Sequence, residues 1–168
     1  MRIIDVIGLS GSGKTYFIMK AIELFKIQLG YNVTVFKNVK HHQIDEKGKD
    51  SHIFKKSGAT YSIIQNINNE MAIFLKSEEN GFERLIKWLE QGPYKIDIVF
   101  TEGFRNLNNP TVLCVSNIEE IKTQIAKNVK IISGAICAKS KVEDIPYNIP
   151  LINIEENFER FLDVFKIH

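Results

Sequence analysis

Residues 8–15 are Gly8-Leu9-Ser10-Gly11-Ser12-Gly13-Lys14-Thr15, a stretch that fits the phosphate-loop pattern G-x-x-x-x-G-K-[ST]. For a chain of this length and composition, the probability that the pattern occurs by chance somewhere in the sequence is roughly half a percent. The context also fits, because a short β-branched run precedes the motif and helix-spaced apolar residues follow it. The stretch therefore predicts a strand, a phosphate-binding turn and a helix, and with them a bound nucleotide.

Each residue type in this loop suits one part of a phosphate chain. Glycines allow backbone N–H groups to turn inward as an anion nest, and the start of the following helix adds partial positive charge. Lys14 is expected to neutralise the outer phosphates, and the Thr15 hydroxyl to ligate the accompanying Mg²⁺. The predicted nucleotide-binding residues of the loop are Ser10, Gly11, Ser12, Gly13, Lys14 and Thr15.

The segments around the loop predict the fold class. Residues 3–7 are expected to form a mostly buried strand, and the apolar spacing from Lys14 onward predicts a helix that ends at Gly30. Residues 31–36 predict a second strand. A strand, a helix and a strand within about 35 residues form a βαβ unit, which implies a parallel sheet with right-handed crossovers. We therefore expect an α/β fold with a predominantly parallel sheet flanked by helices.

The rest of the chain continues in short strands and helices. The expected strands are 61–65, 71–75, 96–101, 111–115, 130–137 and a brief one from Pro150, and the expected helices are a short one at 50–58 and others at 82–89, 118–127 and 158–165. No internal repeat, low-complexity tract or linker interrupts this order. The sequence therefore predicts a single domain over residues 1–168.

Composition and charge exclude several classes of protein. The 168 residues include 22 basic and 20 acidic ones, and the net charge of +2 gives no electrostatic reason to bind nucleic acid. Cys114 and Cys137 are too few and too far apart for a disulfide framework or a metal knuckle. No apolar stretch approaches the roughly 20 residues of a spanning helix, and the N-terminus lacks the features of a signal peptide. These observations predict a cytoplasmic protein without a nucleic-acid or membrane partner.

A carboxylate is expected near the phosphate-bound Mg²⁺, at the carboxyl end of a neighbouring strand. The predicted strand at 96–101 offers Asp97 near its amino end and Glu102 directly after it. The two residues lie about 16 Å apart at ~3.3 Å per residue. Glu102 is therefore the predicted metal-side carboxylate, together with Thr15, and Gly103 permits close approach.

Residues 37–59 form a long polar segment with six lysines, three acidic residues and three of the four histidines. Its start is expected at the same edge of the sheet as the phosphate loop, and a connection of this length and polarity is typical of a functional segment. Lys49 and Asp50 are candidates for contact with a bound phosphate or metal, and a helix N-cap is the alternative role of Asp50. His41 and His42 are candidates for a metal or phosphate contact.

Three stretches together resemble the molybdopterin-guanine dinucleotide biosynthesis protein B (MobB) family. They are the phosphate loop, Gly48-Lys49-Asp50-Ser51 followed by Ser57-Gly58-Ala59, and Thr101-Glu102-Gly103-Phe104-Arg105. Proteins of that family carry a phosphate loop of this form, a Gly-Lys-Asp-Ser block leading to Ala-Gly-Ala, and Val-Glu-Gly-Phe-Lys. The resemblance extends to about residue 105. The chain departs from the family's Lys-His-x-His-His segment, where Asn38 replaces the first histidine and His41-His42 remain.

The resemblance implies a fold and a function. The fold would be the phosphate-loop NTPase fold of the class that includes the nitrogenase iron protein and signal-recognition GTPases (SIMIBI). The protein would bind GTP with Mg²⁺, hydrolyse it slowly if at all, and act as a homodimeric accessory to the guanylyltransferase that attaches GMP to molybdopterin. Molybdopterin is a further candidate partner. Guanine preference comes from the resemblance alone, since the chain has no Asn-Lys-x-Asp motif. Ala138-Lys139-Ser140 is a candidate for packing on the base.

Two other classes stay open from the residues. A small-molecule kinase uses the same phosphate cradle, with Asp45 or Asp50 to position its acceptor, but the four arginines of the chain form no lid cluster. A GTP-dependent metal-centre insertion factor would favour dense cysteine and histidine sets, which this sequence lacks. Formation of a phosphorylated small molecule from ATP or GTP would distinguish a kinase from an accessory protein.

Overall fold

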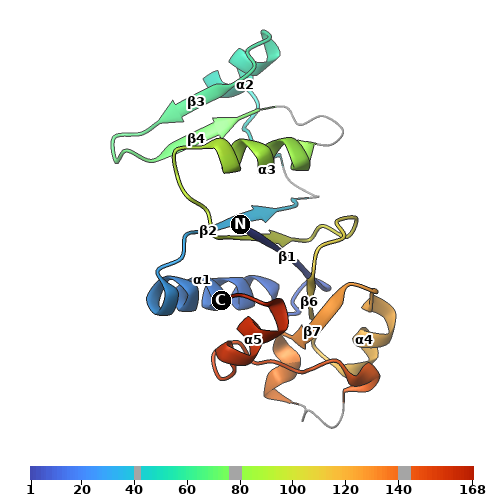
Figure 1. Ribbon diagram of the computed structural model, residues 1–168. Coiled ribbons are helices and arrows are strands. Elements are labelled where there is room, and N and C mark those ends of the chain that lie inside the picture. Colours follow the sequence, from blue (N-terminus) through green and yellow to red (C-terminus); the bar gives the residue numbers. More distant parts are fainter. Residues whose placement is uncertain (40–42, 76–80, 140–144) are drawn as a thin grey trace. The chain divides into compact units, whose positions relative to one another are not determined.

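The computed structural model describes residues 1–39, 43–75, 81–139 and 145–168 (Figure 1). The chain divides into two compact units, of which the first comprises Met1–Asn38 and Tyr94–His168 and the second Val39–Pro93. The phosphate loop and Glu102 belong to the first unit, and Lys49 belongs to the second. The single domain expected over residues 1–168 stays a prediction. No helix within the described ranges is long and apolar enough to cross a membrane.

The first unit is built on a five-stranded sheet in the order β2-β5-β1-β6-β7, and every pairing in it is parallel. The strands are β1 (Arg2–Ile7), β2 (Val33–Lys37), β5 (Ile98–Glu102), β6 (Thr111–Cys114) and β7 (Val129–Ser133). Since parallel strands end at the same edge, the segments that follow β1, β2 and β5 leave the sheet side by side. The expected parallel α/β architecture is confirmed.

Helices cover both faces of this sheet (Figure 1). They are α1 (Lys14–Leu29), α4 (Ile118–Gln124), α5 (Phe158–Phe165) and the short 3₁₀ helices η1 (Ala135–Ala138) and η3 (Pro146–Asn148). One apolar cluster joins α1 and α5 to the sheet, and a second joins α4 and η1 to it. Because side chains alternate along a strand, Val112 and Cys114 of β6 belong to the first cluster and Leu113 to the second.

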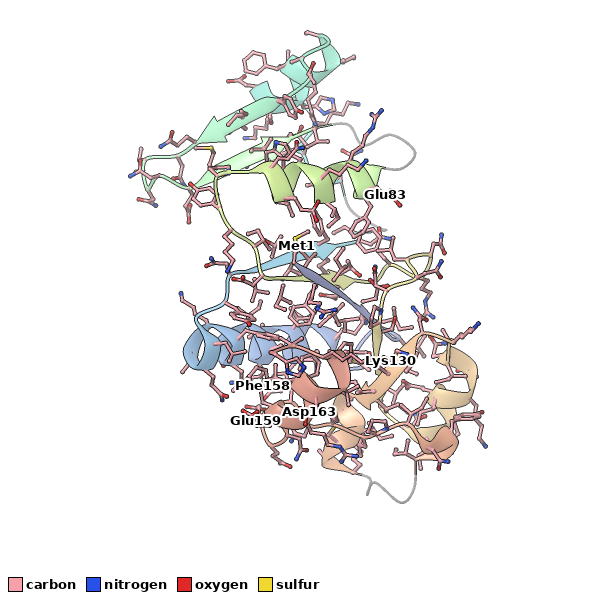
Figure 2. All side chains as sticks on the ribbon, in the orientation of Figure 1. Met1, Glu83, Lys130, Phe158, Glu159 and Asp163 are labelled. Atoms are coloured by element: carbon pink, nitrogen blue, oxygen red, sulfur yellow. The ribbon has the colours of Figure 1, made fainter. Side chains whose placement is uncertain are left out.

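Aromatic packing holds α1, which begins at the phosphate loop, against the sheet. Phe25 is fully buried and contacts Phe100 of β5 and Phe158 of α5, with ring centroids 6.1 and 5.2 Å away. Figure 2 shows the amphipathic character of α5, in which Phe158 is buried while Glu159 and Asp163 are exposed. Burial of each such aromatic ring contributes roughly 1.5–3 kcal/mol. The helix that follows the phosphate loop is therefore held firmly against the sheet.

The expected strand at 130–137 is too long, because β7 ends at Ser133 and η1 follows it. Gly134 causes this end, since its φ of 94° and ψ of −154° leave the extended conformation. The expected helix at 118–127 also stops early, at Gln124, although it begins as predicted, with the Asn117 side chain accepting from the Glu120 N–H. The brief strand from Pro150 is reduced to a bridge between Leu151 and Ile132.

The second unit contains α2 (Asp50–Lys56), an antiparallel hairpin of β3 (Ser62–Gln65) and β4 (Met71–Phe74), and α3 (Gly81–Gln91). All four elements were expected from the sequence. Asn66 closes the hairpin, because its side-chain oxygen accepts from the Asn68 and Glu70 N–H groups. Within the described residues of this unit, no hydrophobic side chain is fully buried.

Candidate nucleotide-binding site

The phosphate loop between β1 and α1 needs glycine at two positions. A Cβ on Gly8 would lie 2.1 Å from the Cys114 carbonyl oxygen and 2.6 Å from Ser12 Oγ. Gly13 directly precedes α1 and has a φ of 92°. Residues other than glycine rarely adopt this left-handed backbone conformation. Glycine at these two positions therefore lets the loop backbone pass close to β6 and adopt a left-handed turn before α1. A residue with a side chain would prevent both.

The start of α1 is prepared for an anion. The N-cap, Gly13, has no side chain that could cap this helix end, and the first turn holds no acidic residue, so the N–H groups and the partial positive charge face an anion without local competition. Ser12 is fully buried, and its hydroxyl has no hydrogen-bond partner within the part of the chain that the structure describes. A buried polar atom without a partner is rare, and here it lies in the loop that would hold a phosphate.

The two residues predicted to lie at the metal are brought together. The Thr15 hydroxyl lies 3.2 Å from Oε1 and 3.3 Å from Oε2 of Glu102, to which it donates. The Glu102 side chain is 9% exposed. This donor set suits Mg²⁺, which prefers oxygen ligands, keeps several waters and takes few ligands from the protein. Among the described residues, no group of three or more His, Cys, Asp and Glu side chains is placed to hold a metal ion.

Strand order explains why Thr15 and Glu102 meet. β5 lies beside β1, with Val6 opposite Glu102 in the register, and the Gly103 N–H donates to the Val6 carbonyl at 3.1 Å. Glu102 therefore ends its strand at the point where β1 gives way to the phosphate loop. Asp97 lies just before β5 begins, and its carboxylate accepts from the Asn32 N–H at 3.0 Å. The prediction that Glu102, and not Asp97, lies at the phosphate side is consistent with this placement.

Lys14 makes an internal contact in this structure. Its ammonium donates to the Leu9 carbonyl oxygen at 2.6 Å, across the phosphate loop to which both residues belong. A lysine on a flexible four-carbon stem exchanges such a carbonyl readily for a phosphate oxygen. The position of Lys14 is thus compatible with the predicted role at the outer phosphates.

Lys37 is a site residue that the sequence analysis did not single out. It ends β2, lies opposite Glu102 in the register, and places its ammonium 3.2 Å from Glu102 Oε1. The available signal was its position directly after the strand predicted at 31–36, at the edge where the phosphate loop was expected. The sequence could not show that β2 pairs with β5, and this pairing is what makes Lys37 and Glu102 neighbours.

The segment after β7 also reaches the phosphate loop. The Ala135 N–H donates to the Ser12 carbonyl oxygen at 3.1 Å, and a Cβ on Gly13 would lie 3.2 Å from the Ala135 nitrogen. Of the candidate base-packing residues, Ala138 and Lys139 are exposed just beyond this contact, whereas Ser140 lies outside the described residues. The sequence predicts residues 134–137 as part of a strand, and no local pattern indicates that they approach the phosphate loop.

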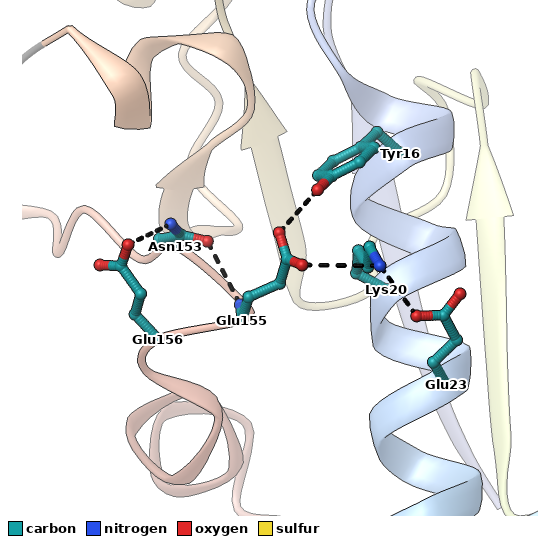
Figure 3. A network of polar contacts seen from close by, with 6 residues as sticks. All are labelled: Tyr16, Lys20, Glu23, Asn153, Glu155 and Glu156. Carbon is teal, nitrogen blue, oxygen red and sulfur yellow. Dashed lines mark hydrogen bonds and ion pairs between the residues drawn. The ribbon is translucent and has the colours of Figure 1, made fainter.

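The first turns of α1 are also tied to the segment before α5 (Figure 3). The Tyr16 hydroxyl donates to Glu155 Oε2 at 2.7 Å, and the Lys20 ammonium lies 3.6 Å from Glu155 Oε1. The hydrogen bond to Glu155 raises the pKa of Tyr16, since ionisation would place two negative charges side by side. Asn153 supports this arrangement by accepting from the Glu155 N–H. The network is exposed and restrains the helix that carries Lys14 and Thr15.

The predicted residues of the polar segment lie in the second unit. Lys49 is exposed, with its ammonium 3.7 Å from Glu46 Oε2, and Asp50 is the first residue of α2. The N-cap of α2 is Lys49, so the alternative N-cap role of Asp50 is wrong, although its carboxylate still suits the first helical turn. The predicted contact of Lys49 and Asp50 with a ligand stays a prediction, and His41 and His42 lie outside the described residues.

Asp45 has a structural role at α2. The Ser51 hydroxyl donates to Asp45 Oδ1 at 2.7 Å, and the Lys55 ammonium lies 2.6 Å from Oδ2. These partners, Lys55 first, hold the pKa of Asp45 below its ordinary value of 3.8. A carboxylate that is already bound to a cation and a hydroxyl is poorly suited to accept a proton from a kinase substrate.

A parallel sheet, a glycine loop leading from its central strand into a helix, and a carboxylate at the end of the adjacent strand define the phosphate-loop (P-loop) class of α/β proteins. The model of the family Molybdopterin guanine dinucleotide synthesis protein B (MobB) matches residues 3–136, and the chain belongs to this family. The family resemblance found from the sequence is thereby confirmed.

Several known proteins are similar to this chain. A putative molybdopterin-guanine dinucleotide biosynthesis adapter protein of Methanocaldococcus jannaschii is 27% identical over 122 residues, which are 70% of this chain and 48% of the relative. The chain thus spans about half the length of the curated relative that it matches. Among solved structures, MobB of Bacillus subtilis has a TM-score of 0.71 at 20% identity, covering 100% of this chain and 99% of that one. A MobB homologue of Bacillus stearothermophilus has a TM-score of 0.66 at 16% identity, with both chains covered fully.

Proposed function

We propose that this protein binds GTP with Mg²⁺ and serves as an accessory protein of molybdenum cofactor biosynthesis, assisting the conversion of molybdopterin to molybdopterin guanine dinucleotide. The observation that carries the nucleotide-binding part is the pairing of Thr15 with Glu102 beside a glycine loop of phosphate-loop geometry. Family membership carries the rest, since the M. jannaschii relative is described as an adapter protein for this dinucleotide. A cytoplasmic location follows from this role.

In this proposal, each group of the phosphate loop contacts a different part of the nucleotide. The N–H groups at the start of α1 bind the phosphates, Lys14 exchanges the Leu9 carbonyl for an outer phosphate oxygen, and Thr15 turns its hydroxyl to the metal. Glu102 would hold the metal together with Thr15, directly or through water. The bound Mg²⁺ supplies positive charge that neutralises the phosphates.

Hydrolysis of the nucleotide is proposed to be slow at most. Glu102 faces the Thr15 hydroxyl at the predicted metal position, which suits a metal-side carboxylate better than a general base. Slow turnover fits an adapter, because such a protein acts through its bound state. Hydrolysis of radiolabelled GTP supplied in excess over the protein tests this directly, and several turnovers per minute would contradict it.

The guanine preference is tested by competition. GTP and ATP compete for the protein in the presence of Mg²⁺, and GTP is expected to bind more tightly. Equal affinity would leave a general nucleotide-binding protein. The accessory role is tested separately, by adding the protein and GTP to a molybdopterin guanylyltransferase and measuring dinucleotide formation. Appearance of a phosphorylated small molecule in place of the dinucleotide would support the kinase alternative.

A homodimer is proposed from the composition of the second unit's surface. Its exposed large hydrophobic residues include Ile53, Phe54, Tyr61, Ile63, Ile64, Met71, Ile73 and Trp88. The described part of this unit buries no hydrophobic side chain completely. Exposed apolar surface on this scale is typical of a protein–protein interface. A second copy of the chain is the proposed cover, and sedimentation equilibrium measures it. A monomer at micromolar concentration would contradict the proposal.

A further inference from the structure

We propose that Lys37 competes with the divalent cation for the Glu102 carboxylate and, once displaced, binds the terminal phosphate, so that it favours nucleotides with a third phosphate. The inference rests on the proposed binding of a Mg²⁺-nucleotide at the phosphate loop. It assigns to Lys37 a role in selecting the ligand of that site.

The first step of the argument is the shared carboxylate. Lys37 and Glu102 are partners in the parallel register of β2 and β5, and the Lys37 ammonium lies 3.2 Å from Glu102 Oε1. The Thr15 hydroxyl, predicted to ligate the metal, lies 3.2 Å from the same oxygen. One carboxylate oxygen thus meets both the lysine and the hydroxyl on the metal side, and a divalent cation at this oxygen would face the ammonium at close range.

The second step is the difference in freedom between the two partners. The Glu102 side chain is 9% exposed, whereas the Lys37 side chain is 55% exposed. Glu102 sits in the central sheet, and Lys37 extends on a flexible four-carbon stem. A nearly buried carboxylate requires a compensating positive charge, which either an ammonium or a metal ion can supply. The ammonium is therefore the partner that moves.

The third step is the destination of the displaced ammonium. Lys37 ends β2 at the same edge of the sheet as the phosphate loop, because β2, β5 and β1 are parallel and adjacent. The loop has its own lysine, Lys14, for the outer phosphates. A second ammonium at this edge gains most from the terminal phosphate of a nucleoside triphosphate, where the negative charge is greatest.

The experiment compares Lys37→Met with wild type by calorimetric titration of GTP and GDP at a series of Mg²⁺ concentrations. Lys37→Met should reach half-maximal nucleotide binding at a Mg²⁺ concentration lower by about threefold or more, because the competing ammonium is gone. The ratio of GTP affinity to GDP affinity should fall by about fivefold or more. An unchanged Mg²⁺ requirement or an unchanged affinity ratio would overturn the proposal.

Two further variants make the result specific. Lys26→Met removes an exposed lysine from the last turn of α1 and should leave both quantities at the wild-type values. Lys37→Arg keeps the positive charge and should retain the preference for GTP, and loss of that preference would count against the proposal. If wild type itself shows no Mg²⁺-dependent nucleotide binding, the proposed function fails. If wild type binds but Lys37→Met behaves identically, only the role of Lys37 fails.

Discussion

The Ala135 N–H donates to the Ser12 carbonyl oxygen at 3.1 Å, which fastens the segment after β7 to the phosphate loop. Gly134 makes this contact possible, because a Cβ there would lie 2.2 Å from the same Ser12 oxygen. The two segments are more than a hundred residues apart in the chain, yet each limits the conformation of the other. The shape of the phosphate loop therefore depends on a glycine that lies outside the loop.

Gly134→Ala tests this dependence. The added methyl group would strike the Ser12 carbonyl and must displace the phosphate loop, while the φ of 94° adds backbone strain. We expect a lower melting temperature and a loss of nucleotide affinity of about tenfold or more. Thermal unfolding and titration calorimetry measure the two effects.

Gly30→Ala is the matched control for Gly134→Ala. Gly30 also has a positive φ, of 65°, but a Cβ there meets nothing within 4 Å, and the residue lies at the far end of α1. This variant should lose about 1–2 kcal/mol of stability to the left-handed backbone and keep its nucleotide affinity. Equal losses of affinity in the two variants would mean that the Gly134 contact has no special effect on the loop.

Lys14→Ala tests the phosphate loop itself. The substitution removes the cation expected at the outer phosphates and leaves the sheet core intact, so the protein should fold. Loss of a charge-assisted contact of roughly 1.5–3 kcal/mol should weaken triphosphate binding by about 10- to 150-fold. Titration of GTP into the folded variant measures the change. An unaltered dissociation constant would place the nucleotide elsewhere.

The site could be predicted from the sequence where local pattern and strand direction were enough. The loop at 8–15 has a recognisable motif, and Glu102 follows from the rule that ligands lie at the carboxyl ends of parallel strands. Thr15 and Glu102 do lie within hydrogen-bond distance. The order of strands could not be predicted, because no local pattern specifies which strand pairs with which.

Two features of the site could not be predicted, because both depend on contacts between segments that are distant in the sequence. Lys37 reaches Glu102 through the pairing of β2 with β5, whereas the sequence indicates only that Lys37 directly follows the strand predicted at 31–36. The apolar run around Gly134 predicts a strand, since a single glycine among β-branched residues carries a weak signal. Its positive φ follows from the close approach to Ser12, which is a tertiary contact.

Asp97→Asn tests an ion pair at the opposite end of β5. The Asn32 N–H and then the Lys95 ammonium lower the pKa of Asp97 below its ordinary value of 3.8. A lowered pKa in the folded state stabilises the protein above the unfolded value, and this contribution is lost as the pH falls through 3.8 and below. The variant should therefore be less stable than wild type at pH 7, and the difference should shrink on acidification.

Denaturant unfolding at several pH values between about 7 and 2.5 measures this effect. Asp163→Asn serves as the control, since Asp163 is an exposed carboxylate on α5. The free energy of unfolding of Asp163→Asn should depend on pH in the same way as that of wild type over the whole range. A stability difference for Asp97→Asn that stays constant with pH would contradict the assignment.

Lys49→Ala tests whether the polar segment serves a second ligand or holds the nucleotide. The Lys49 side chain is exposed, its ammonium lies 3.7 Å from Glu46 Oε2, and it makes no capping hydrogen bond to α2, so the substitution should not disturb folding. If Lys49 contacts a pterin phosphate or the partner enzyme, GTP affinity should stay within about threefold of wild type, a change below ~0.7 kcal/mol. Stimulation of the guanylyltransferase should be lost. Lys47→Ala, in the same exposed segment, is the control and should keep both properties. A fall in GTP affinity as large as that of Lys14→Ala would assign Lys49 to the nucleotide itself, and its separate role would be wrong.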